Sequence, residues 1–156
     1  ALISSHAPWV PILPVLDWER IDAGRVFRQW DGAGDPPAVV WQDTERVRRH
    51  FARALAYAVR VAGEYAVRHV DERTLLVLLG DHQPAPLITG RDASRAVPVH
   101  VVSGDPALLR PFLERGFVRG MMPAEAGTAP RMAAFRGWLH EAFGAGRVAE
   151  APQPGS

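Results

Sequence analysis

The sequence contains no cysteine and no lysine. Without cysteine there is no disulfide framework, no thiolate metal site and no cysteine nucleophile, so any metal must be bound by oxygen and nitrogen ligands. All 18 basic residues are therefore arginine, and the 17 acidic residues leave a formal net charge of +1. This balance gives no indication of a surface for nucleic acid or for anionic membranes.

Long apolar runs are also missing. No run approaches the roughly 20 residues that a membrane-spanning helix needs, and residues 1–6 lack the charged and apolar regions of a signal peptide. We therefore expect a soluble chain that does not itself span a membrane. Its 156 residues, 47% of them hydrophobic, are enough to bury one sizeable core, so one domain is expected.

The amino-terminal part is rich in proline and tryptophan. Residues 7–37 hold five prolines and three tryptophans. Proline interrupts helices and central strands, so this part is expected to be extended and to lie across other elements. A strand could lie at residues 38–41, whose sequence is Ala-Val-Val-Trp.

The following region has the periodicity of a helix. Over residues 44–69, apolar side chains recur every three or four positions, while arginines gather on the opposite side. This pattern predicts one long amphipathic helix with Asp43 or Thr44 as its N-cap and a solvated arginine surface. The predicted core side consists of Val47, Phe51, Leu55, Ala58, Ala62 and Tyr65.

Two continuous apolar runs follow, at residues 74–79 and 97–102. Runs of this kind are typical of strands in a parallel sheet that is covered on both faces. Because two or three strands are too few for such a sheet, the chain has the pattern of the carboxy-terminal part of a larger α/β domain. This part is predicted to occupy residues 1–145, followed by a flexible tail at 146–156.

The carboxy-terminal region is predicted to hold two helices. The first, at residues 107–114, has Asp105 as its N-cap, and the second covers residues 132–143. Residues 117–130 contain several glycines and prolines and are expected to form a loop.

The strongest candidate site is Gly80-Asp81-His82, directly after the first apolar run. Ligands in open α/β sheets bind beyond the carboxyl ends of strands. Adjacent residues of a regular strand point to opposite faces, so Asp81 and His82 can share an ion only if the backbone turns here. Gly80 permits such a turn, and Pro84 prevents a return to the ladder. On spacing alone the signal is weak, and a turn capped by Asp81 with His82 as an ordinary loop histidine is the favoured interpretation.

These residues resemble a known family. Residues 74–82, Thr-Leu-Leu-Val-Leu-Leu-Gly-Asp-His, resemble the strand and metal-binding motif of the alkaline phosphatase and sulfatase superfamily, in particular its lipoteichoic-acid-synthase-like branch. Ser5-His6-Ala7-Pro8 matches the branch's Ser-His-x-Pro segment, and residues 97–103 resemble its Val-Pro strand. The resemblance extends from His6 to about residue 143, although Gln83 stands where the family commonly has glycine.

The resemblance implies a three-layer αβα fold with a mostly parallel sheet, whose missing strands belong to an absent amino-terminal portion. It also implies Asp81 and His82 as ligands of a divalent ion (Zn, Mn, Mg or Ca) and His6 as a hydrogen-bond donor to a phosphate or sulfate ester. The family's nucleophile lies upstream of these motifs, so the chain alone is expected to be inactive. In this branch the upstream portion often spans the membrane, which implies an extracytoplasmic domain of a membrane-anchored bacterial protein.

The alternative is a non-catalytic α/β binding module or a degenerate family member, in which Gly-Asp-His is only a turn at the end of a strand. The other histidines have no partners at metal-ligand spacing. His50, His69 and His140 are therefore interpreted as ordinary residues, and His100 as part of a strand.

Overall fold

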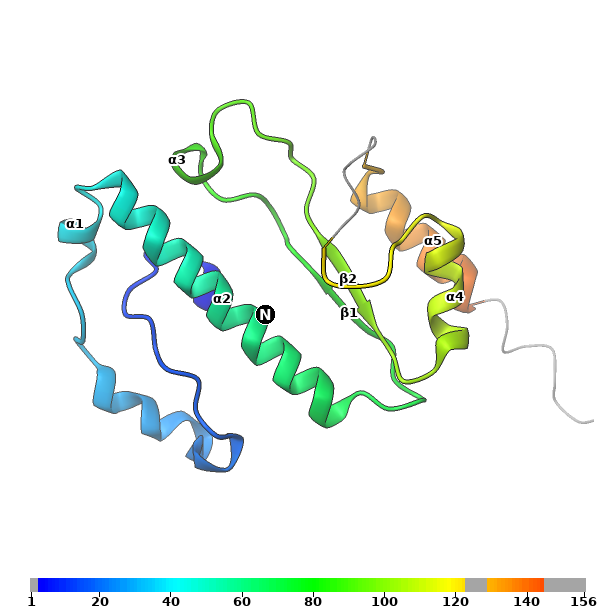
Figure 1. Cartoon of the computed structure of the whole chain (residues 1–156), viewed down its shortest axis with the longest axis horizontal. Helices are drawn as coiled ribbons and strands as arrows, with labels where there is room; N and C mark the ends of the chain where they lie inside the picture. Colours follow the sequence, from blue (N-terminus) through cyan, green and yellow to red (C-terminus); the bar gives the residue numbers. More distant parts are fainter. Residues whose placement is uncertain (1–2, 123–128, 145–156) are drawn as a thin grey trace, which may run out of the picture. The chain divides into compact units, whose positions relative to one another are not determined.

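The computed structural model describes residues 3–122 and 129–144 (Figure 1). The chain divides into two compact units, Ala1–Gly104 and Asp105–Ser156. Its helices and one small sheet confirm that the chain combines helix and sheet, which is the general part of the fold prediction. The predicted tail at 146–156 and positions 123–128 of the predicted loop lie outside the described residues.

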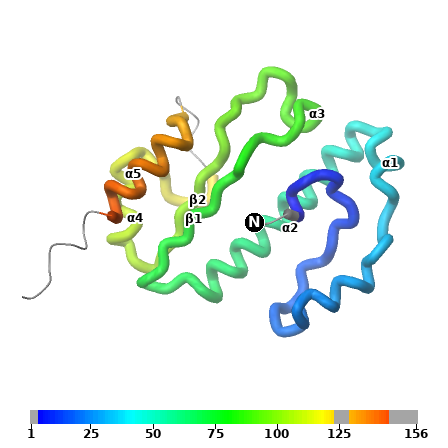
Figure 2. The backbone as a smooth tube through the Cα atoms, turned by 180° about the vertical axis from the view of Figure 1, so that it is seen from behind, coloured from blue at the N-terminus to red at the C-terminus, as the bar shows by residue number. Residues whose placement is uncertain are grey.

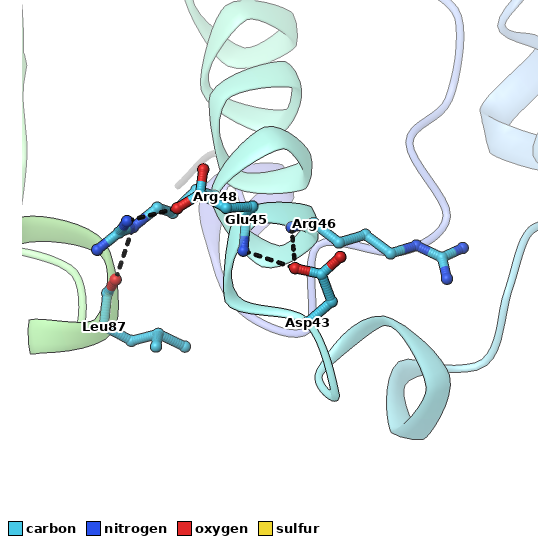
Figure 3. A network of polar contacts seen from close by, with 5 residues as sticks. All are labelled: Asp43, Glu45, Arg46, Arg48 and Leu87. Atoms are coloured by element: carbon cyan, nitrogen blue, oxygen red, sulfur yellow. Dashed lines mark hydrogen bonds and ion pairs between the residues drawn. The ribbon is translucent and has the colours of Figure 1, made fainter.

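The longest element of the first unit is α2, Thr44–His69, and its bounds agree with the predicted helix. Asp43 is the N-cap, since its carboxylate accepts hydrogen bonds from the backbone N–H groups of Glu45 (2.9 Å) and Arg46 (3.2 Å) (Figure 3). These bonds satisfy two of the N–H groups that the first turn of a helix leaves without a backbone partner.

The buried side of α2 is narrower than predicted. Val47, Ala54 and Ala58 are buried as one stripe along the helix. Leu55 and Tyr65 were expected in the core, but each is 44% exposed, so the prediction is wrong for these two side chains. The elements that pack on α2 are η1 (Ile3–Ser5) and α3 (Pro86–Thr89). Because each is only about one turn long, they leave part of the apolar side of α2 uncovered.

The amino-terminal segment is only partly extended. Residues 9–17 contain no helix or strand, but two 3₁₀ helices follow, η2 at Trp18–Arg20 and η3 at Asp22–Trp30. No proline lies between positions 15 and 35, so nothing there prevents short helical turns. The prediction of an extended segment is therefore only partly correct. The segment contains short helices and runs beside α2, as Figures 1 and 2 show.

Two side-chain contacts fasten η2 to the carboxy-terminal half of α2. The Trp18 indole donates to Glu64 (3.2 Å), and Arg68 pairs with Glu19 (3.1 Å). Hydrogen bonds from Arg60 and then from Trp18 hold the pKa of Glu64 below its ordinary value. The Arg68–Glu19 pair is exposed, so we expect it to contribute little to stability, whereas the Trp18–Glu64 bond is partly buried.

The strand considered at residues 38–41 is absent. Instead, α1 forms one helical turn at Pro37–Val40, with Pro37 in the first turn, where its missing N–H has no cost. Val40 is fully buried at the end of this turn.

Both predicted strands form, but they are shorter and pair in the opposite sense. β1 (Leu76–Leu79) and β2 (Val99–Val102) are antiparallel, with Leu76 opposite Val102 and Leu79 opposite Val99. The prediction of parallel strands is therefore wrong for this pair. The physical reason is the connection: the Gly80 N–H donates to the Pro98 carbonyl (3.3 Å), so residues 80–98 return as a wide hairpin and do not cross over the sheet.

The second unit is built on two helices. Asp105 caps α4 (Pro106–Glu114) by accepting from the Ala107 N–H (2.8 Å), as predicted. Phe112 is 2% exposed, and its ring meets the edge of Trp138 on α5 (Met132–Gly144) at 4.9 Å. Aromatic packing therefore joins the two helices of this unit.

A close backbone contact lies at the end of β2. The Gly104 N–H donates to the Asp71 carbonyl (3.0 Å), and the Asp71 carboxylate accepts from the Thr74 hydroxyl (2.7 Å) and the Arg73 N–H (3.0 Å). The bond from Thr74, and next that from Arg73, hold the pKa of Asp71 below its ordinary value. A Cβ atom on Gly104 would lie 2.7 Å from the carbonyl carbon of Asp71.

We predict that Gly104→Ala destabilises the protein by about 1–3 kcal/mol, because two backbone segments must move apart to accept the methyl group. Gly63→Ala is the matched control: the site in α2 is open, and alanine favours helix by about 0.5–1 kcal/mol. Urea unfolding measures both changes. An unchanged urea midpoint for Gly104→Ala would contradict a close backbone contact between Gly104 and Asp71.

Candidate metal centre

Asp81 and His82 lie in a bend just beyond β1, where the backbone leaves strand geometry. Their side chains converge, with Asp81 Oδ2 3.7 Å from His82 Nε2. The same carboxylate accepts from the His82 backbone N–H (3.0 Å), so the bend is held locally. Both side chains are open to solvent, at 89% exposure for Asp81 and 68% for His82.

The donor set fits one divalent ion. Zinc bonds to imidazole nitrogen and carboxylate oxygen measure about 2.0–2.2 Å, so two ligand atoms of one tetrahedral ion lie roughly 3.4 Å apart. The separation of 3.7 Å between Asp81 Oδ2 and His82 Nε2 is slightly wider, and both side chains are exposed and can adjust. Among the described residues no group of three or more His, Asp or Glu side chains gathers. A complete coordination shell therefore needs donors in addition to this pair.

His82 has a defined hydrogen bond on its other ring nitrogen. Nδ1 lies 2.8 Å from the Gln83 carbonyl oxygen. A carbonyl can only accept, so in the neutral ring this contact favours a proton on Nδ1, and Nε2 is the nitrogen that faces the Asp81 carboxylate. Metal-binding histidines commonly have this second bond, which fixes the tautomer.

His6 lies between η1 and the first proline and is exposed. Its Nδ1 is 2.8 Å from the Ala7 carbonyl oxygen. Within the ranges that the structure describes, no hydrogen bond or ion pair joins His6 to Asp81 or His82. Of the three candidate residues, Asp81 and His82 are the two that the described part of the chain shows in direct contact.

The segments that carry His6 and His82 nevertheless pack in one hydrophobic cluster. Trp9 is 6% exposed, and Leu87 and Ile88 of α3 are among the side chains packed against its cluster. The complete cluster, which includes side chains of α1 and α2, consists of Trp9, Val10, Val40, Val47, Phe51, Ala54, Leu87 and Ile88. The chain after each candidate residue is therefore held by the same face of α2.

Polar contacts support this arrangement. The Arg48 side chain of α2 donates from Nε to the Leu87 carbonyl (3.1 Å) and pairs with Glu45 (2.7 Å) (Figure 3). The Trp9 carbonyl oxygen lies 3.3 Å from Nδ1 of His50, also on α2. Sequence reasoning missed both Arg48 and His50, because their partners are distant in sequence and no spacing indicates them.

A recess of about 300 Å³ lies beside η1 and does not include Asp81 or His82. Its lining is mostly apolar, and the Ser4 hydroxyl is buried without a hydrogen-bond partner among the described residues. The lining residues are Ser4, Pro11, Ile12, Leu13, Phe27, Ala54 and Tyr57. The recess therefore includes none of the three residues singled out by the sequence.

Comparisons of this chain with protein family models, curated proteins and solved structures found no match. The function of this chain is therefore inferred from its own motifs and geometry.

We predict that Trp9→Ala loosens both segments and costs about 3–5 kcal/mol, because it removes a buried ring that stacks on Trp41 (5.4 Å) and meets the edge of Phe51 (5.3 Å). Hydrogen exchange should increase together at residues 6–10 and 86–89. Trp9→Phe is the matched variant and should lose less, since it keeps an aromatic ring but not the bond from Nε1 to the Ser5 carbonyl (2.8 Å). Faster exchange at only one of the two segments would contradict a shared cluster.

Proposed function

We propose that this chain is the carboxy-terminal part of a metal-dependent hydrolase or transferase that acts on phosphate or sulfate esters, in the alkaline phosphatase and sulfatase superfamily. The observation that carries the proposal is the convergence of Asp81 and His82 beyond β1, with the Nε2 lone pair of His82 directed to the carboxylate side. A turn that only ended β1 would not need the side chains of Asp81 and His82 to lie close together.

In the proposed mechanism, Asp81 and His82 hold the divalent ion, which when bound polarises the nucleophile and offsets charge on the transferring group. His6 donates a hydrogen bond from Nε2 to a non-bridging or leaving oxygen of the ester, in the ring form that carries a proton on both nitrogens, because its Nδ1 faces the Ala7 carbonyl. The nucleophile and the further carboxylate ligand come from the amino-terminal portion of the same protein. The chain contributes ligands and positioning, and is inactive by itself.

The finer fold belongs to the same proposal. Among the described residues β1 pairs only with β2, although both strands consist almost entirely of apolar side chains and Leu79 is 48% exposed. Many otherwise parallel sheets have one antiparallel strand at their edge. We infer that β2 is such an edge strand and that strands of the amino-terminal portion pair with the free edge of β1, which completes a three-layer αβα fold.

Location follows from the family resemblance alone. Within residues 3–122 and 129–144, no helix combines the length and the apolar character that crossing a membrane requires, which agrees with the sequence-based prediction for this piece. We propose that it is an extracytoplasmic domain of a membrane-anchored bacterial protein. The ester substrate and the amino-terminal portion are its proposed partners.

The proposal predicts that the chain binds Mn²⁺ and that Asp81→Ala and His82→Ala each weaken this binding by roughly tenfold or more, because each removes one of two ligands. Paramagnetic broadening of NMR signals measures weak Mn²⁺ binding and locates it. The broadening should centre on residues 80–83.

Asp92→Ala and His140→Ala are the matched controls, since they remove an exposed carboxylate and an exposed imidazole elsewhere. Both should bind Mn²⁺ as the unmodified chain does. Equal binding in all four variants, or broadening spread over many acidic residues, would favour the alternative of a non-catalytic module.

A further inference from the structure

We propose that Gln83 is a positioning residue for the metal pair, which sets both the orientation and the tautomer of His82. The inference rests on the proposed function, because it assigns Gln83 a role toward the ion that Asp81 and His82 would hold. It concerns a position where the sequence differs from the glycine common in the family that it resembles.

The backbone of Gln83 acts on His82 directly. Its carbonyl oxygen lies 2.8 Å from His82 Nδ1 and keeps the ring proton on that nitrogen. Nε2 therefore presents its lone pair at 3.7 Å from Asp81 Oδ2. If the carbonyl turned away, the proton could move to Nε2 and block the atom that would bind the ion.

The side chain of Gln83 prevents such a turn. Its amide donates to the carbonyl oxygen of Ala96, on the opposite arm of the 80–98 connection. One step closer to the sheet, the Gly80 N–H donates to Pro98 across the same connection (3.3 Å). Gln83 is half-buried, and Pro84 restricts its backbone to extended conformations. The carbonyl is thus held by the side chain and by the following proline.

A glycine at this position could not make this bridge, because it lacks a side chain. The bond to Ala96 thus joins the two arms of the 80–98 connection through a side chain. If Gln83 served only to close the connection, replacing it would not change the tautomer of His82. The tautomer of His82 therefore distinguishes a positioning role of Gln83 from a purely structural one.

The test uses the full chain with ¹⁵N-labelled histidine at about pH 8.5, two units above the ordinary imidazole pKa. Long-range ¹H–¹⁵N spectra should show His82 in the Nδ1–H form. Gln83→Met keeps the side-chain length but removes the donor, and Gln83→Ala removes the whole side chain. In both variants the Nδ1–H signature should give way to a mixture of tautomers, and Mn²⁺ binding should weaken about tenfold.

Gln29→Ala is the matched control, because it also removes a glutamine amide that donates to a backbone carbonyl, that of Val26 (2.8 Å), far from the pair in sequence. It should leave the His82 spectrum and Mn²⁺ binding unchanged. An Nδ1–H tautomer retained in both Gln83 variants would overturn the inference.

The two proposals fail in different ways. Should Asp81→Ala and His82→Ala abolish Mn²⁺ binding while the Gln83 variants leave both tautomer and affinity intact, only the positioning role is wrong. Should the Gln83 variants shift the tautomer while Mn²⁺ binding is the same in every variant, the metal function is wrong, and with it the role of Gln83 toward an ion.

Discussion

The packing of Trp9 and α3 against the amino-terminal half of α2 is the interaction on which the rest of the first unit depends. It joins two segments that are about 80 residues apart and that each follow a candidate functional residue, His6 in one case and His82 in the other. Since the buried stripe of α2 is narrow, few side chains are involved, and each contributes a large part of the contact. Arg48 and His50 add polar contacts to the same two segments, so the helix fixes them by both kinds of interaction.

The two-stranded sheet depends on the wide connection between its strands. Because the Gly80–Pro98 bond closes this connection, β1 and β2 run antiparallel, and Asp81 and His82 lie at its base. A turn placed there lets neighbouring side chains meet, which a regular strand would not allow. Both strands are almost entirely apolar but only partly buried, and this is the main physical support for the proposal that further strands pair with β1.

Local signals in the sequence predicted much of this structure. The helix over Thr44–His69 follows from its period, and the caps at Asp43 and Asp105 follow from the preference of carboxylates for that position. The turn at Asp81 and His82 follows from Gly80 and Pro84. Strand direction could not be predicted, because apolar runs do not encode it. The short helices between Trp18 and Trp30 were missed because the prolines and tryptophans around them indicated an extended segment, although Val26, Phe27 and Trp30 recur at helical spacing. The bridge from Gln83 to Ala96 leaves no trace in residue spacing.

The central claim is that Asp81 and His82 hold one ion together, and electron spin echo spectroscopy of bound Mn²⁺ tests it most directly. The account predicts modulation from one histidine nitrogen in the unmodified chain, which changes on ¹⁵N labelling of histidine and disappears in His82→Ala. Modulation that persists in His82→Ala, or bound Mn²⁺ with no nitrogen coupling in the unmodified chain, would contradict the claim.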